Sequence, residues 1–233
     1  MTQIHIHQVH KTLGVGPKAT HALKGVSLKA AQGDFIAISG KSGSGKTTFL
    51  DMLSGLISID SGSVTVSGVK VDTASEKELL RLRREIIGIV HQSDLIIPEL
   101  TAAENVQLVL SAAGYKPVDS RTAAESLLEQ VGLEGLETRY PDELSRGQCQ
   151  RVGIARALSG NRSILLADEP SAALDQQNSR SVFALFRKLA SQGTTIITAS
   201  HDPIVLDYCT RSFTLIDGLL PVSYTHLTLP TKA

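Results

Sequence analysis

The sequence predicts an α/β protein in which helices cover a mostly parallel sheet and an all-helical segment is inserted into the chain. Short apolar runs alternate with helical patterns along most of the sequence, as is typical of parallel sheets. One such run, Phe35–Ser39, leads into a glycine-rich loop and then into a helical pattern. Between about residues 93 and 160, by contrast, almost every segment has the periodicity of a helix.

Strands are expected where short apolar runs end in polar or turn-forming residues. Runs of this length are typical of strands that are buried on both faces. The turn signal Asp60-Ser61-Gly62 precedes one of them. The expected strands are Phe35–Ser39, Val64–Val66, Ile86–Val90, Ser163–Ala167 and Thr194–Ala199.

Helices are expected where apolar residues recur every three or four positions. In Thr47–Leu56 the apolar residues fall on one face, and Thr101–Glu104 has the pattern of a capping box that opens a helix. Gly132 suits the position that follows a helix. The other expected helices are Ser75–Arg84, Ser120–Val131, Arg146–Leu158 and Asn178–Ser191.

This organisation predicts one domain over residues 1–220, with a core of about 1–92 and 161–220 and a helical subdomain of about 93–160. A chain of 233 residues has room for one domain with an inserted lobe. Residues 221–233 contain two prolines and show no periodicity. We expect an unstructured, non-native tail there, with a short packed strand as the alternative.

Composition excludes several classes of function. The 23 basic and 23 acidic residues balance, and aromatic residues are only 4% of the chain. Both values argue against binding to nucleic acid through bulk charge or base stacking. Two cysteines, Cys149 and Cys209, are too few for a disulfide framework, which favours a reducing compartment. No apolar run approaches the roughly 18 residues of a membrane span, and no secretory signal is visible, so we expect a cytoplasmic protein.

A phosphate-binding loop is the strongest chemical signal. The stretch Gly40–Thr47 fits the pattern G-x-x-x-x-G-K-[ST] and lies between an expected strand and an expected helix. Glycines expose successive backbone N–H groups to phosphate oxygens, and the helix N-terminus adds positive potential. Lys46 is expected to reach the β- and γ-phosphates, and Thr47 to offer a hydroxyl to Mg²⁺. A chance glycine-rich turn is the alternative.

Two acids follow the strand Ser163–Ala167. Asp168 stands where a carboxylate can hold Mg²⁺, and Glu169 is placed to polarise an attacking water. On its own, such a strand end is equally consistent with solvated acids. A second anion site is expected at the N-terminus of the helix Arg146–Leu158, where Ser145 and the Gly147 amide lie.

The ordered set of motifs resembles that of the ATP-binding-cassette (ABC) ATPases over about residues 3–218. The set comprises the phosphate loop, Gln92, the LSRGQ stretch at 144–148, the ADEP stretch at 167–170, the loop 171–175 and His201. The resemblance implies a P-loop core with an antiparallel N-terminal portion and a head-to-tail homodimer with ATP at its interface. Segments such as 81–92 and 95–106 are similar to the MacB/LolD-type subfamily of lipoprotein-release, macrolide-efflux and cell-division ATPases.

The resemblance also implies roles for individual residues. The triphosphate is expected on Gly40, Lys41, Ser42, Gly43, Ser44, Gly45, Lys46, Thr47 and Thr48. Mg²⁺ is expected on Thr47, Gln92 and Asp168, and the residues expected to act in ATP hydrolysis are Glu169, His201, Gln92 and Lys46. A second copy is expected to close the site with Ser145, Gly147 and Gln148, and Asp175 to link the two sites.

Two positions depart from the family pattern. Leu13 stands where the family usually has an aromatic residue that stacks on adenine, so we expect weaker ATP affinity and poorer discrimination against GTP. Arg146 stands where the family more often has glycine, and it is costly only if that backbone needs a positive φ.

The resemblance implies partners as well. We expect an integral-membrane permease on separate chains, which a surface around Gln92–Leu100 receives, and a peripheral position on the cytoplasmic face of the inner membrane. Lobe packing is the alternative for the apolar stretch Leu95–Ile97. A regulatory ATPase that transports nothing, as in cell-division complexes, shares every motif. Soluble repair or translation ATPases and small-molecule kinases fit less well.

For other conspicuous residues, a structural interpretation is simpler than a functional one. His5, His7 and His10 lie on or near a first strand, where a metal site is conceivable, but a solvated strand face explains them better. Cys149 follows the LSRGQ stretch and is expected to be a packed or bystander thiol.

Overall fold

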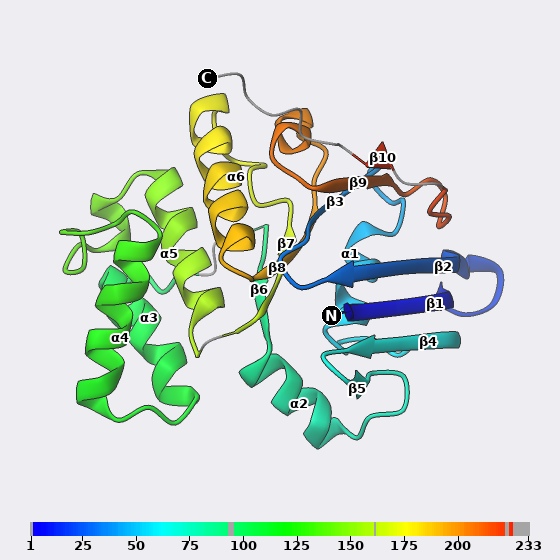
Figure 1. The fold of residues 1–233 in the computed structure, drawn as a ribbon, viewed down its shortest axis with the longest axis horizontal. Helices are drawn as coiled ribbons and strands as arrows, with labels where there is room; N and C mark the ends of the chain where they lie inside the picture. The colour runs from blue at the N-terminus through cyan, green and yellow to red at the C-terminus, as the bar shows by residue number, and fades with distance from the viewer. Residues whose placement is uncertain (1, 93–95, 161, 222–223, 226–233) are drawn as a thin grey trace.

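The computed structural model describes residues 2–92, 96–160, 162–221 and 224–225 (Figure 1). Its larger sheet has the strand order β10-β9-β3-β8-β7-β6. The neighbours from β9 to β6 run parallel, and β10 is antiparallel to β9. These strands are β3 (Phe35–Ser39), β6 (Ile87–Val90), β7 (Ile164–Asp168), β8 (Thr195–Ala199), β9 (Arg211–Thr214) and β10 (Tyr224–Thr225).

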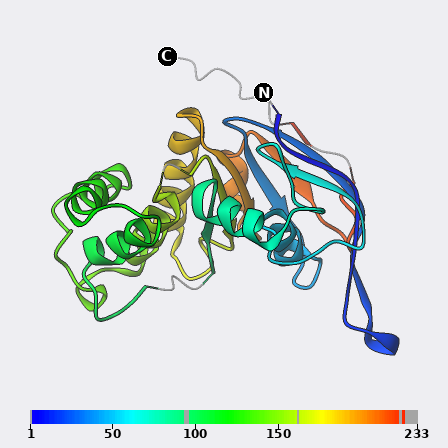
Figure 2. The same cartoon turned by 90° about the horizontal axis from the view of Figure 1, so that it is seen from below.

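The smaller sheet is antiparallel, with the order β2-β1-β4-β5. Its strands are β1 (Thr2–Leu13), β2 (Thr20–Ala31), β4 (Ser61–Val66) and β5 (Val69–Lys70). The long β1–β2 hairpin extends beyond the rest of the sheet, as Figure 2 shows. Leu13, at the end of β1, is carried on this extension.

Six α-helices complete the described chain. They are α1 (Lys46–Leu53), α2 (Glu76–Glu85), α3 (Ala102–Ala112), α4 (Pro117–Gln130), α5 (Arg146–Leu158) and α6 (Gln176–Ser191), with 3₁₀ turns at Gly16–Lys18, Pro141–Glu143 and Pro203–Asp207. The helices α3, α4 and α5 lie between β6 and β7 in the chain and pack on one another, at the left of Figure 1. We call residues 96–160 the helical part. The expected fold class, a parallel core with an antiparallel portion and inserted helices, is confirmed.

The two faces of the larger sheet bury two separate hydrophobic cores, because successive side chains of a strand point to opposite faces. From β3, Phe35 and Ala37 enter one core with α5, α6 and the helical part, whereas Ile36 and Ile38 enter the other. The second core also contains α1 and the inner residues of the smaller sheet, so α1 packs between the two sheets. This packing holds the loop between β3 and α1 at the carboxyl edge of the parallel strands.

Several boundaries differ from expectation for local reasons. Helix α1 ends at Leu53, since Gly55 adopts φ +65° and leaves the helix. Helix α4 begins earlier than expected, at Pro117, because proline is favourable in the first turn. In the tail, Tyr224–Thr225 pair with Ser212 and Arg211 of β9, so the expectation of an unstructured tail is wrong for these two residues. The other tail residues after 221 lie outside the described chain.

No helix in the described ranges is long and apolar enough to cross a membrane.

Candidate nucleotide-binding site

The loop between β3 and α1 folds around the ammonium group of Lys46. Its Nζ donates hydrogen bonds to the carbonyl oxygens of Gly40, at 2.8 Å, and Lys41, at 3.3 Å. Lys46 is the first residue of α1 and only 9% exposed. The ammonium group is therefore held inside the loop, and its charge lies at the positive end of the helix dipole.

Two glycines let this loop lie directly against neighbouring backbone. Gly45 has φ +104°, and a Cβ atom there would stand 2.4 Å from the carbonyl oxygen of Ala22. At Gly40 a Cβ atom would stand 2.5 Å from the carbonyl oxygen of Leu215. Any side chain at either position would clash with backbone, so the glycines are required by packing as well as by conformation.

The carboxyl end of β7 carries two acids with different surroundings. Asp168 Oδ2 accepts a hydrogen bond from the Thr47 hydroxyl at 2.8 Å. Glu169 adopts φ +49°, an uncommon conformation for a non-glycine residue that costs on the order of 1–3 kcal/mol. Its N–H donates to the carbonyl of Ala199 at 2.8 Å, which holds this turn in place. The turn brings Glu169 Oε1 to 3.6 Å from Nζ of Lys46.

His201 completes this group from the loop after β8. Its Nδ1 lies 2.7 Å from Glu169 Oε2, and its backbone N–H donates to the same oxygen at 3.2 Å. A carboxylate only accepts hydrogen bonds, so Nδ1 carries the hydrogen when Glu169 is ionised. The Glu169 side chain is 13% exposed, between two cationic or donor groups. It is therefore oriented by Lys46 on one side and by His201 on the other.

These residues line a cavity of about 630 Å³. Sequence-predicted residues that the structure brings together there are Leu13, Gly40, Lys41, Ser42, Gly43, Gly45, Lys46, Thr47, Thr48, Gln92, Asp168, Glu169 and His201. Thr20 and Ala22 of β2 line it too, which the sequence did not reveal. Ser44 does not line this cavity; its buried hydroxyl has no hydrogen-bond partner among the described residues.

The LSRGQ residues lie outside this cavity, at the start of α5. Ser145 and Gln148 form a capping box: Ser145 N–H donates to Gln148 Oε1 at 2.8 Å, and Gln148 N–H donates to Ser145 Oγ at 3.3 Å. The Ser145 hydroxyl therefore retains its own hydrogen for a further acceptor. Arg146 is not among the residues with positive φ, so the arginine has an ordinary helical backbone and avoids the cost that a glycine-only conformation would impose.

Asp175 also lies away from the cavity and caps α6. Its carboxylate accepts from the backbone N–H of Asn178 at 2.8 Å and from the Asn178 amide at 2.7 Å, and these bonds lower the pKa of Asp175. A Cβ atom on Gly147 would stand 2.5 Å from Asn178 Oδ1. Asn178 thus joins the two segments predicted to face a second copy, a role that sequence reasoning missed.

Two further polar groups support the site without having been predicted. The Ser171 hydroxyl donates to Asp202 Oδ2 at 3.1 Å and so ties the loop after β7 to the residue beside His201. The only sequence signal for Asp202 is its place as a helix cap before Pro203. Behind Asp168, burial and the nearby Asp168 charge raise the pKa of Asp51.

The candidate histidines are separate from this site. His5, His7 and His10 are exposed on β1, with 6.4 Å between the ring centroids of His5 and His7. Within the described ranges, no group of three or more His, Cys, Asp or Glu residues is arranged to hold a metal ion. Burial raises the pKa of the Cys209 thiol to about 11.

The residues present fit a nucleoside triphosphate with Mg²⁺. The glycine loop and the enclosed ammonium of Lys46 offer donors to anionic oxygens. The Thr47 hydroxyl and the Asp168 carboxylate are already adjacent, and such oxygens are the ligands that Mg²⁺ prefers.

Comparison with known proteins identifies the family. A family model described as "ABC transporter" matches residues 23–172, more than half of the chain. The protein belongs to the ABC transporter family, and it contains the ATP-binding domain of such a transporter.

Two curated relatives show the range of architectures. The macrolide export ATP-binding/permease protein MacB of Mannheimia succiniciproducens is 39% identical over 218 residues, which are 94% of this chain but 34% of that protein. The chain thus spans about a third of the length of its MacB relatives. The ABC transporter ATP-binding protein YtrE of Bacillus subtilis is 39% identical over 222 residues, which cover 93% of this chain and 96% of YtrE.

Solved structures of ABC cassettes have the same fold as this chain. The cassette MJ0796, a dimer in a post-hydrolysis state bound to ADP and phosphate, has a TM-score of 0.85 and 36% identity, covering 95% of this chain and 98% of that one. CbiO1 of Clostridium perfringens, part of the complex cbiONQ, has a TM-score of 0.87 and 28% identity, covering 96% and 88%.

Proposed function

We propose that this chain hydrolyses ATP as a head-to-tail homodimer and that closure of the dimer drives a membrane permease on separate chains. The observation that carries this proposal is the position of Glu169 between Lys46 and His201, over a cavity that also contains the Thr47–Asp168 pair. Such an arrangement suits phosphoryl transfer to water, which needs positioning and charge neutralisation more than covalent chemistry.

Each side chain has one task in this proposal. The loop residues and Lys46 bind the triphosphate, while Thr47, Asp168 and Gln92 hold Mg²⁺, which neutralises phosphate charge when it is bound. Glu169 orients the attacking water and accepts its proton. His201 keeps Glu169 in position through Nδ1 and leaves Nε2 to face the γ-phosphate. His201 and Lys46 hold the carboxylate in the orientation that this task needs.

The residues outside the cavity act on the nucleotide of a second copy. Ser145 has a free hydroxyl hydrogen at the N-terminus of α5, where a γ-phosphate is favoured by the helix dipole. The solved dimer of the related cassette MJ0796, bound to ADP and phosphate, supports this assembly. Asn178 bonds to Asp175 and lies against Gly147 of α5, so both can respond to the same nucleotide.

The transport role that we propose is export, lipoprotein release or force transmission to a permease at the cytoplasmic face of the inner membrane. The relatives named for macrolide export favour it. The alternative is a regulatory ATPase of the cell-division type that transports nothing. Nucleic acid has no place in either proposal, and contact with the membrane is made only through the permease.

Co-purification tests the proposed partner. A tagged Glu169→Gln protein is expressed in its source cells, and detergent-solubilised membranes are purified with ATP and Mg²⁺ present. We expect a permease with few spans and a large extracytoplasmic domain. A permease with many spans and a solute-binding protein would indicate import instead, and an intact dimer without any membrane partner would contradict the proposal.

Leu13 is expected to limit nucleotide affinity. It lines the cavity and is 41% exposed, so it offers dispersion contacts but no ring to the base. Replacing Leu13 with tyrosine should tighten ATP binding about ten-fold, since stacking of a base on an aromatic ring contributes roughly 1–3 kcal/mol, and should increase discrimination against GTP. Titration calorimetry with both nucleotides measures the change, and unchanged affinities would contradict the prediction.

The surface after Gln92 is expected to couple hydrolysis to the permease. Ile96 packs against the core around α3, which favours lobe packing for that residue, and Leu95 lies outside the described residues. Ile97 is half-buried. Ile97→Glu should therefore leave basal hydrolysis within two-fold but remove stimulation by reconstituted permease about ten-fold, because a charge in an apolar contact is costly. Ile97→Gln is the uncharged control, and equal loss of both activities would contradict a coupling role.

A further inference from the structure

Asp51 places a further carboxylate close to the residues expected to hold Mg²⁺. It lies on α1 four residues after Thr47, and side chains with this spacing share one face of a helix. That face meets the end of β7, where the Thr47 hydroxyl donates to Asp168 at 2.8 Å. Thr47, Asp51 and Asp168 together line a small cavity of about 40 Å³. The sequence motifs do not include Asp51.

The small cavity and the nucleotide cavity share one wall. Thr47 and Asp168 line both of them, whereas Asp51 lines only the small one. Asp51 therefore stands behind the Thr47–Asp168 pair and makes no direct contact with a ligand in the nucleotide cavity. Any effect of Asp51 on such a ligand passes through Asp168.

The like charges of Asp51 and Asp168 repel each other. Burial and the Asp168 charge both raise the pKa of Asp51, and only the charge of His91 lowers it. Within the described ranges, neither acid forms an ion pair with a lysine or arginine. The two acids together carry excess negative charge, which a divalent cation on Asp168 compensates.

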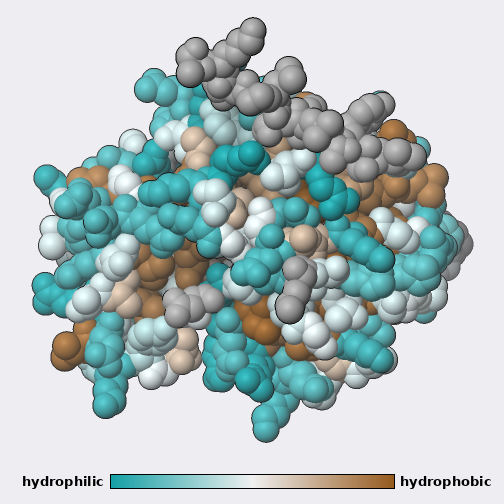
Figure 3. All heavy atoms as spheres, viewed as in Figure 1, coloured by the Kyte–Doolittle hydropathy of each residue, from teal (hydrophilic) through white to brown (hydrophobic). Residues whose placement is uncertain are grey.

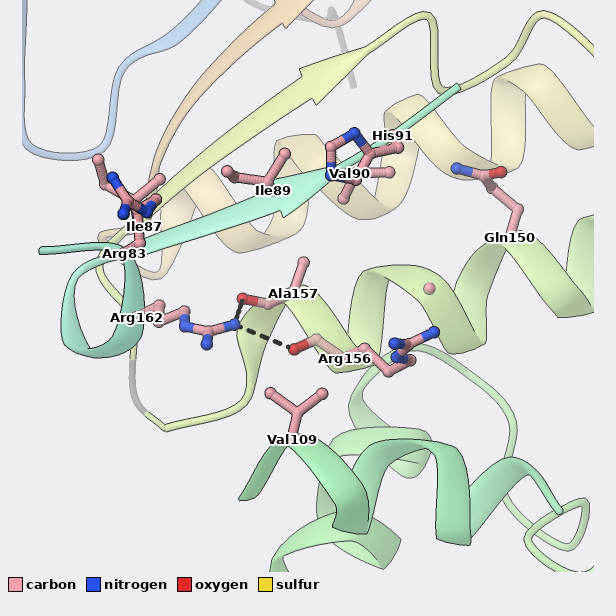
Figure 4. Close-up of a pocket in the computed structure, with 11 residues that line it drawn as sticks. Arg83, Ile87, Ile89, Val90, His91, Val109, Gln150, Arg156, Ala157 and Arg162 are labelled. Atoms are coloured by element: carbon pink, nitrogen blue, oxygen red, sulfur yellow. Dashed lines mark hydrogen bonds between the residues drawn. The ribbon is translucent and has the colours of Figure 1, made fainter. Parts of the chain in front are cut away.

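His91 lines the small cavity from the neighbouring strand. In Figure 4 it follows Val90 at the end of β6, and Val90 pairs with Ala167, the residue before Asp168. His91 also lines a larger cavity of about 280 Å³ between the core and the helical part. The surface is hollowed between the helical part and α2 at the lower edge of Figure 3, and His91 is exposed. Because an exposed imidazole is well solvated, it compensates two carboxylates only in part.

We propose that Asp51 is a positioning residue of the metal site, which strengthens Mg²⁺ binding by turning Asp168 toward Thr47 and by adding negative charge behind this pair. The metal and the nucleotide rest on the proposed function. Two carboxylates held close together destabilise the metal-free site, and a cation on Asp168 removes that cost. Asp51 thereby makes tight ATP binding more dependent on the metal.

Nucleotide binding with and without the metal tests this role. The non-hydrolysable analogue AMP-PNP is titrated by calorimetry into wild type and Asp51→Asn, once with excess MgCl₂ and once with EDTA. We expect Asp51→Asn to lower the ratio of the two affinities about five-fold, since one negative charge fewer attracts the divalent cation. It should bind metal-free AMP-PNP at least as tightly as wild type. Loss of affinity by the same factor in both conditions would reveal a purely structural role and overturn the proposal.

Two control variants separate position from net charge. Asp51→Glu keeps the carboxylate and should preserve most of the wild-type ratio. Asp119→Asn, in the exposed first turn of α4, removes the same charge from the helical part and should leave the ratio unchanged. An Asp119→Asn ratio as low as that of Asp51→Asn contradicts a specific role for Asp51.

Thermal melting without nucleotide tests the repulsion between the two acids. In EDTA, we expect Asp51→Asn to melt about 2 °C higher than wild type, since the repulsion and the burial of one charge are both removed. Excess MgCl₂ should then raise the melting temperature of wild type more than that of Asp51→Asn. An Asp51→Asn protein that melts below wild type in EDTA, or an equal rise with MgCl₂, overturns the proposal. Failure of wild type to bind AMP-PNP defeats the proposed function instead, and the melting comparison still decides the role of Asp51.

Discussion

Replacing Lys46 with alanine is expected to weaken ATP binding about 100-fold. The lysine provides a charge-assisted contact, and hydrogen bonds to charged groups contribute roughly 1.5–3 kcal/mol each. It also organises the loop, because its Nζ donates to the carbonyls of Gly40 and Lys41. Both effects are lost together, and titration calorimetry with ATP and Mg²⁺ measures the sum.

Control variants separate this effect from loss of the fold. Lys46 is 9% exposed, so the alanine protein is compared with wild type by circular dichroism and thermal melting. Lys70→Ala, on the exposed end of β5, removes the same charge far from the loop and should bind ATP like wild type. A folded Lys46→Ala protein with wild-type affinity would falsify the assignment of this loop.

Replacing Glu169 with glutamine is expected to lower the hydrolysis rate by about 10²–10⁴-fold and to leave ATP binding intact. An amide keeps the shape of the side chain but cannot accept a proton, and general-base catalysis contributes this range. Because ATP then persists between the two copies, the variant should elute as a dimer from a sizing column with ATP and as a monomer with ADP.

Phosphate release under single-turnover conditions measures the chemical step directly. Glu76→Gln, in the first turn of α2 and exposed, is the matched change of charge and should hydrolyse ATP like wild type. A Glu169→Gln protein that retains a tenth or more of the rate would show that another group activates the water. His201→Gln then becomes the informative variant, since His201 Nδ1 lies 2.7 Å from Oε2 of Glu169.

The sequence alone was enough for the features that depend on neighbours in the chain. The strand Phe35–Ser39 and the helix Arg146–Leu158 have the bounds that their patterns predict. The capping box at Thr101–Glu104 forms as expected, with the Glu104 carboxylate bonded to the Thr101 N–H at 2.8 Å. Local hydrogen bonding, glycine conformation and periodic burial decide these elements, and each of them is visible within a few residues of sequence.

Strand β2 was harder to predict, although it is long. Gly25, with φ +75°, interrupts its alternation, and the pairing with β1 contains several register shifts. The apolar face of such a strand is recognised only once its partner strand is in place.

The nucleotide cavity shows what only the tertiary structure decided. The sequence determined that a phosphate loop, two acids after a strand and a histidine occur in order. It did not determine the left-handed turn that brings Glu169 to Lys46, because the bond to the carbonyl of Ala199 comes from the adjacent strand β8. Nor did it show that Thr20 and Ala22 of β2 line the same cavity. Long-range packing of strands that are distant in the sequence sets both arrangements, and no local pattern in the chain records such contacts.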